Sequence, residues 1–122
     1  MLYRISIAWS YYESEEAPSS YRFETDVERD AFRRGVAAVC GHPGSFQLAE
    51  DEQARTVSVR WQDGTTDTHT FFYAPARIGF RFGVEQAIMP SSYRIVDTWE
   101  TPDDGQSSVT ATPYSPAPDA LA

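Results

Sequence analysis

The chain of 122 residues is long enough for one domain and too short for two full cores. Hydrophobic residues make up 41% of it and charged residues 23%, which excludes a wholly disordered or fibrous protein. The formal net charge of −8 disfavours direct binding to nucleic acid or to an anionic membrane, so we expect a basic partner. Because no apolar run approaches ~20 residues and no signal-peptide pattern is visible, we expect a cytoplasmic protein of a bacterial or archaeal cell.

Absent residue types exclude several kinds of chemistry. All ten basic residues are Arg, so neither a lysine Schiff base nor the lysine of a phosphate-binding P-loop is available. The single cysteine, Cys40, excludes a disulfide within the chain and a thiolate-rich metal site. We therefore predict no metal and no cofactor.

The N-terminal part predicts a pair of antiparallel strands. Apolar and polar residues alternate over residues 2–11, which is typical of a half-buried strand. The stretch 13–20 is polar and contains Pro, so we interpret it as a loop. Alternation resumes over residues 21–24, which should pair with the first strand.

A helix is predicted over residues 25–40. Thr25 and Glu28 have the spacing of a capping box, in which the Glu28 carboxylate reaches back to the Thr25 amide. Apolar residues then recur every three or four positions and form one stripe. Gly41 suits the left-handed residue that ends a helix.

A three-stranded meander is expected next. Phe46 and Leu48 indicate a short strand, and residues 55–61 alternate as a second one. The pair Asp63 and Gly64 is a strong hairpin signal that leads into a strand over residues 66–73. No internal repeat is visible in the sequence.

The last part of the domain is ambiguous. Residues 78–89 fit a strand and a short helix equally well, and residues 93–99 suggest a final strand. Residues 101–122 are rich in Pro, Ser and Thr, so we expect a disordered tail after a single domain over residues 1–100.

These elements predict an α+β fold, with an antiparallel sheet of about five to six strands and one main helix packed on one face. Aromatic residues make up 14% of the chain, more than a single helix stripe can cover. Either a second element covers the other face of the sheet, or part of that face is an interaction surface.

The few candidate catalytic groups favour structural roles. Cys40 falls at the end of the predicted helix, where the helix dipole disfavours a thiolate, so we interpret it as a small buried residue. His42 and His69 lack the spacing of zinc hydrolases. We expect His69 to contact its neighbours across the strands and predict that the protein is not an enzyme.

Acidic residues dominate the stretch 13–30, which holds seven of them against Arg22 and Arg29. We predict an acidic binding surface with an aromatic contact centre. The acidic residues proposed for it are Glu13, Glu15, Glu16, Glu24, Asp26, Asp30, Glu50, Asp51 and Glu52. The aromatic residues are Trp9, Tyr11, Tyr12 and Tyr21.

In size, acidity and lack of catalytic groups, the chain resembles small orphan proteins of phages and mobile elements, including anti-CRISPR-type inhibitors. This resemblance implies a binding protein that docks on a basic, nucleic-acid-binding surface of a host protein or nucleoprotein complex. Two alternatives stay open. One is a small enzyme or ligand-binding domain with a pocket around His69 and Tyr73. The other is a self-associating structural or virion component, and a homodimer is compatible with either.

Overall fold

The structure is a computed structural model that describes residues 1–12, 14–42 and 44–102. The elements follow in the order β1 (Leu2–Tyr11), β2 (Ser14–Glu15), β3 (Ser19–Phe23), α1 (Asp26–Val39), β4 (Phe46–Asp51), β5 (Thr56–Trp61), β6 (Thr66–Thr70), α2 (Ala74–Gln86) and β7 (Ser92–Thr101). The predicted tail, 101–122, lies outside the described residues except for Thr101, which ends β7, and Pro102.

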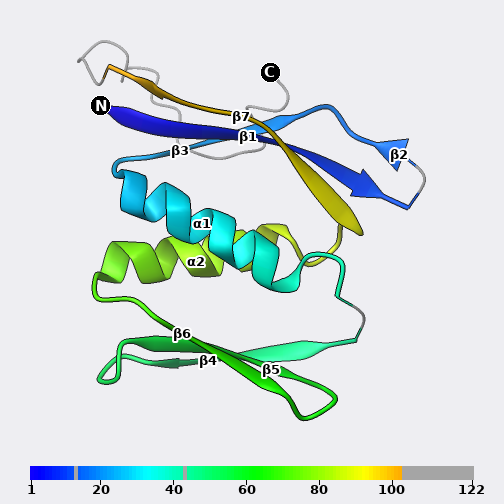
Figure 1. The fold of residues 1–122 in the computed structure, drawn as a ribbon, viewed down its shortest axis with the longest axis vertical. Coiled ribbons are helices and arrows are strands. Elements are labelled where there is room, and N and C mark those ends of the chain that lie inside the picture. Colours follow the sequence, from blue (N-terminus) through cyan, green and yellow to red (C-terminus); the bar gives the residue numbers. More distant parts are fainter. Residues whose placement is uncertain (13, 43, 103–122) are drawn as a thin grey trace.

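The two helices lie side by side between two antiparallel sheets (Figure 1). In one sheet, β1 lies between β3 and β7, and short β2 pairs with the end of β1. In the other sheet, β5 lies between β4 and β6. The α+β class and the antiparallel pairing are confirmed. The strands nevertheless divide into two sheets where the sequence led us to expect one, and a second helix joins the first.

Helix α1 begins as predicted, at an N-cap formed by Thr25. The Glu28 amide donates to Thr25 Oγ1 at 3.1 Å. The second half of the predicted capping box differs, because the Glu28 carboxylate accepts a hydrogen bond from the Thr25 hydroxyl. The cap therefore still satisfies one of the free amides of the first turn.

The ambiguous residues 78–89 are largely helical, as part of α2. The predicted strand over residues 66–73 correspondingly ends at Thr70, so that its last three residues lead into the helix. Pro75 lies in the first turn of α2, where its missing N–H has no helical partner to lose. The proline thus marks the start of a helix, and the strand ends before it, at Thr70.

Glycines allow the two helices to touch backbone to backbone. A Cβ on Gly35 would overlap the carbonyl oxygen of Phe80, and a Cβ on Gly83 would overlap that of Phe32. Both phenylalanines are fully buried, and each contacts the sheet on its own side. The face of α2 that carries its glycines therefore packs on α1.

The chain contains a repeated β-β-α-β arrangement that the sequence did not reveal. The first unit comprises β1, β3, α1 and β4, and the second comprises β5, β6, α2 and β7. Each unit contributes its last strand to the sheet of the other, since β4 pairs with β5 and β7 pairs with β1. The two halves consequently cannot separate without breaking both sheets.

Equivalent side chains make equivalent contacts in the two halves. Phe32 packs on two rings of the preceding strand, Tyr21 and Phe23, with centroids at 4.8 and 5.1 Å. Phe80 packs in the same way on His69 and on Phe71, just past β6, at 4.6 and 5.0 Å. The repeat therefore extends from the topology to the core.

The ion pairs between helices and sheets follow the same repeat. Arg29 of α1 contacts Glu100 of β7 at 3.0 Å, and Arg77 of α2 contacts Glu50 of β4 at 2.7 Å. Each arginine thus binds the strand that the other unit contributed. These contacts link each helix to the exchanged strand of its sheet.

Candidate functional site

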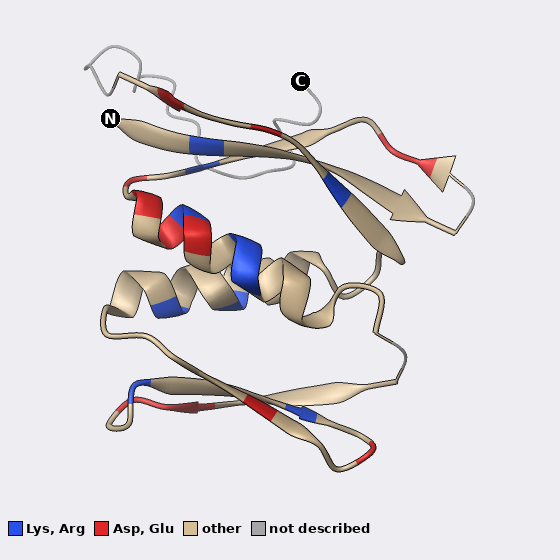
Figure 2. Ribbon diagram, viewed as in Figure 1, with Lys and Arg blue, Asp and Glu red and all other residues tan. Residues whose placement is uncertain are grey.

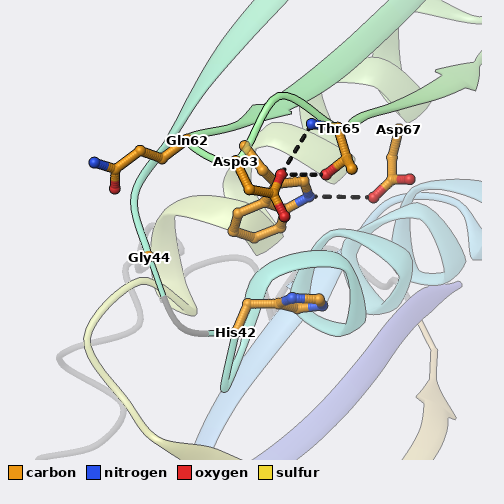
Figure 3. A pocket seen from close by; sticks show the side chains of 7 residues that line it. His42, Gly44, Gln62, Asp63, Thr65 and Asp67 are labelled. Atoms are coloured by element: carbon orange, nitrogen blue, oxygen red, sulfur yellow. Dashed lines mark hydrogen bonds between the residues drawn. The ribbon is translucent and has the colours of Figure 1, made fainter.

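A hollow of about 370 Å³ opens at the hairpin between β5 and β6 (Figure 3). The loop that follows α1 supplies His42 and Gly44, and the hairpin supplies Trp61, Asp63 and Asp67. Aromatic and acidic side chains therefore line the same space. Residues from distant parts of the sequence meet here because β4 pairs with β5 directly after that loop.

Hydrogen bonds hold the two sides of the hollow together. The Gln62 amide donates to the carbonyl oxygen of Ser45 at 2.9 Å, and the Ser45 hydroxyl donates to the Gln62 side chain at 3.1 Å. Across the hairpin, the Trp61 amide donates to the carbonyl oxygen of Thr65. The hollow is thus formed by two loops that are fixed to each other.

The Trp61 side chain is the centre of the site. Its indole ring stacks on the His42 imidazole with centroids 4.5 Å apart and an interplanar angle of 27°. Its cross-strand neighbour Phe46 lies at 5.2 Å, and the indole N–H donates to Asp67 Oδ2 at 3.2 Å. These contacts fix the ring orientation, and Trp61 remains partly exposed.

The carboxylate of Asp63 is held in place and charged. Its Oδ1 accepts hydrogen bonds from the amide and the hydroxyl of Thr65, at 2.9 and 2.7 Å. These two bonds, the amide first, hold the pKa of Asp63 below its ordinary value. Neither Asp63 nor Asp67 takes part in the ion pairs found among the described residues. The hollow therefore presents negative charge that no arginine described here neutralises.

The equivalent tryptophan in the other half of the molecule, Trp9, is buried. Trp9, like Trp61, lies near the end of the central strand of its sheet and pairs with an aromatic residue, Tyr93. Trp9 is only 5% exposed, and its N–H donates to the Tyr21 hydroxyl at 3.0 Å. Trp9 in the first unit is thus part of the core, whereas Trp61 in the second unit lines an open hollow.

The acidic residues predicted to form one surface are spread over the molecule (Figure 2). Glu13 lies outside the described residues. Glu15 and Glu16 belong to the β2 region, and Glu24, Asp26 and Asp30 lie at the start of α1. Glu50, Asp51 and Glu52 lie in β4 and the turn after it.

Three of these acidic residues, Glu15, Glu50 and Glu52, form ion pairs with arginines. Glu15 contacts Arg94 at 3.2 Å. Glu50 contacts Arg77 at 2.7 Å and Arg81 at 3.3 Å. Glu52 contacts Arg77 at 3.7 Å. Their charges are thus partly neutralised within the protein.

The predicted aromatic contact residues differ in their exposure. Trp9 and Tyr21 are buried and bonded to each other, so they belong to the core. Tyr11 is partly buried against that core, and Tyr12 is 92% exposed. Of the four, only Tyr12 presents most of its side chain at the surface. Trp61 was predicted as a strand residue, and its part in a site depends on its proximity to His42.

His69 lies against Phe80, and Tyr73 is exposed at the N-cap of α2. Neither residue lines the hollow at Trp61. Arg34 Nη2 contacts His69 Nδ1 at 3.2 Å, so the Nδ1 atom accepts and the proton is on Nε2. The Nε2 atom is buried without a hydrogen-bond partner among the described residues.

Cys40 lies at the C-cap of α1, with its Sγ atom 3.8 Å from the carbonyl oxygen of Pro90. Burial raises the pKa of its thiol. Both observations agree with the structural role predicted for this cysteine.

Comparisons with known protein families, with curated proteins and with solved structures give no match to this chain. Within residues 1–12, 14–42 and 44–102, no group of three His, Cys, Asp or Glu side chains is placed to hold a metal ion. No helix in the same part of the chain is long and apolar enough to cross a membrane.

Proposed function

We propose that the protein is a non-enzymatic binding module, and that it recognises a basic partner protein by taking an Arg or Lys side chain into the hollow at Trp61. One observation carries this proposal: the same open space is lined by an aromatic stack and by two acidic residues that form no ion pair with any residue the structure describes. Aromatic faces and carboxylates are the two groups that attract a cation in a partly dry site.

The energetics favour a cation over a neutral ligand. A cation close to an aromatic face gains roughly 0.5 to 2 kcal/mol, more as water is excluded. Asp63 remains ionised because Thr65 stabilises its charged form. The net charge of −8 adds long-range attraction for a basic surface.

Such a module would act as an inhibitor if the captured arginine or lysine belongs to a nucleic-acid-binding surface of its partner. The carboxylates of Asp63 and Asp67 would then take the place of backbone phosphates beside that side chain. Inhibition of this kind is what we expect of a mobile-element inhibitor. The net charge of −8 and the acidic residues in the hollow at Trp61 support it.

The test uses N-acetyl-arginine amide as the probe and its uncharged citrulline analogue as the matched ligand. Binding is followed by NMR, through the indole N–H signal of Trp61. We expect the arginine compound to shift this signal with millimolar affinity and the citrulline compound to leave it nearly unchanged.

Two protein variants complete the test. Asp67→Asn can still accept the hydrogen bond from Trp61, so the fold is retained while the charge is lost. We expect it to weaken binding at least fivefold. Asp30→Asn removes an exposed charge in α1 and should leave binding unchanged. Equal binding of both compounds, or equal loss in both variants, would show that the hollow is not the cation site.

A further inference from the structure

A second hollow adjoins the one at Trp61 and is mainly apolar. It measures about 520 Å³, within the range of pockets that bind small molecules and side chains. Its apolar walls come from α1, from β4 and from the end of α2 and the turn after it: Val39, Phe46, Leu48, Val84 and Ile88. We refer to it as the apolar groove.

The apolar groove and the hollow at Trp61, which we call the acidic hollow from here on, have three lining residues in common. His42, Gly44 and Trp61 line both. An occupant of both spaces therefore contacts these residues with an apolar group in the groove and with a cation in the hollow. The two sites are close enough for neighbouring side chains of one peptide.

Exposed apolar side chains line the groove. Ile88 is 54% exposed and Leu48 is 36% exposed. The adjacent Met89 is 80% exposed. Unbranched methionine adapts its shape to a bound side chain, and exposed methionines are common at binding surfaces. A ligand that covers these side chains gains the free energy of burying apolar area.

We propose that the apolar groove and the acidic hollow together bind an extended segment of a partner protein, in which a large apolar side chain lies two positions from an Arg or Lys. This inference rests on the proposed function, because the hollow supplies the cation site. Residues i and i+2 of an extended segment point to the same side, which suits two adjacent hollows.

Charge complementarity identifies a separate partner as the occupant. Asp63 and Asp67 line the hollow at Trp61, and Glu85 lines the apolar groove. None of the three takes part in the ion pairs found among the described residues. Residues 103–122 of this chain contain neither Arg nor Lys, so they cannot supply the cation.

The experiment compares three peptides on the full-length protein: Ac-Gly-Leu-Ser-Arg-Gly-NH2, the same peptide with Ala for Leu, and the same peptide with Gln for Arg. Affinities come from NMR titration. We expect the Leu and Arg peptide to bind at least tenfold more tightly than either of the others, and to shift the signals of Ile88 and Trp61 together.

Two isoleucines of similar exposure provide matched variants. Ile88→Asp places a charge in the groove, whereas Ile78→Asp places one on the part of α2 that does not line it. We expect Ile88→Asp to weaken binding of the Leu and Arg peptide at least fivefold and not to weaken binding of N-acetyl-arginine amide, because the added carboxylate adjoins the cation site without lining it. Ile78→Asp should alter neither.

The outcomes separate this inference from the proposed function. If N-acetyl-arginine amide binds and the Leu and Ala peptides bind equally, the cation site stands and the groove proposal is overturned. If no arginine compound binds, the proposed function itself fails. A dimer that Ile88→Asp dissociates, or peptide binding seen only after removal of residues 103–122, would overturn the inference by assigning the groove to the chain itself.

Discussion

Gly83 of α2 packs directly on the backbone carbonyl of Phe32 in α1, and Gly35 makes the reciprocal contact with Phe80. The two helices can approach this closely only where a side chain is absent. In both helices the phenylalanine of the pair points to its own sheet and fills the core there. The glycines thus set the distance between the two sheets through the helix layer.

We predict that Gly83→Ala destabilises the protein by about 2 kcal/mol, because the added Cβ forces the helices apart in a packed core. Helix propensity alone predicts the opposite sign, since Ala is favoured over Gly by roughly 1 kcal/mol. Ala37→Gly, on the exposed side of α1, is the control and should cost only that amount. Urea denaturation measures both, and a stabilised Gly83→Ala variant would contradict the packing argument.

The two equivalent ion pairs should differ in strength. Arg77 has 10% of its side chain exposed and Glu50 31%, whereas Glu100 is 46% exposed. We expect Glu50→Gln to destabilise the protein by about 2 kcal/mol, less than a fully buried pair because Glu50 retains contact with water. Glu100→Gln should cost under about 1 kcal/mol. Similar losses in thermal unfolding for the two variants would rule out this difference.

Stability should fall as the pH decreases through the range in which histidine titrates. Burial, followed by the nearby Arg34 guanidinium, lowers the pKa of His69 below its ordinary value, although Asp67 opposes this. The unfolded chain therefore binds a proton near pH 6.5 that the folded protein takes up only at lower pH. The contribution of neutral His69 to the free energy of unfolding is fully present above about pH 6.5. It is lost as the pH falls through the lower pKa of His69 in the folded protein.

The matched variant is His69→Gln, which is neutral throughout this range. We expect the unfolding midpoint of the wild type to fall between pH 7.5 and 5.5, and that of His69→Gln to fall less. Parallel pH profiles of the two proteins would show that protonation of His69 does not cause the loss of stability.

Cys40 should react slowly with thiol reagents. Its thiol is partly buried and its pKa is raised, so little thiolate is present at pH 7. We expect modification by Ellman's reagent at pH 7 to be at least tenfold slower than that of free cysteine, and to accelerate in denaturant. Modification as fast as that of the free amino acid would contradict the structural role.

Local patterns in the sequence were sufficient for most of the elements. The alternation over residues 2–11, the cap at Thr25 and the hairpin at Asp63 each depend on neighbouring residues, and the structure confirms all three. Residues 78–89 were ambiguous, because their apolar residues fit the period of a strand and that of a helix equally well. Contact of α2 with α1 favours the helix over the strand. No local pattern in the sequence indicates that contact.

The sequence by itself determined the α+β class, the negative charge and the restriction to Arg as the basic residue. Tertiary structure alone decided that the strands form two sheets with exchanged strands, because the pairing of β7 with β1 joins opposite ends of the domain. It also brought His42 to Trp61 and placed the described acidic residues between 15 and 30 outside the lining of the hollow. A candidate site assembled from distant loops depends on such long-range pairing. Local patterns in the sequence do not predict this pairing.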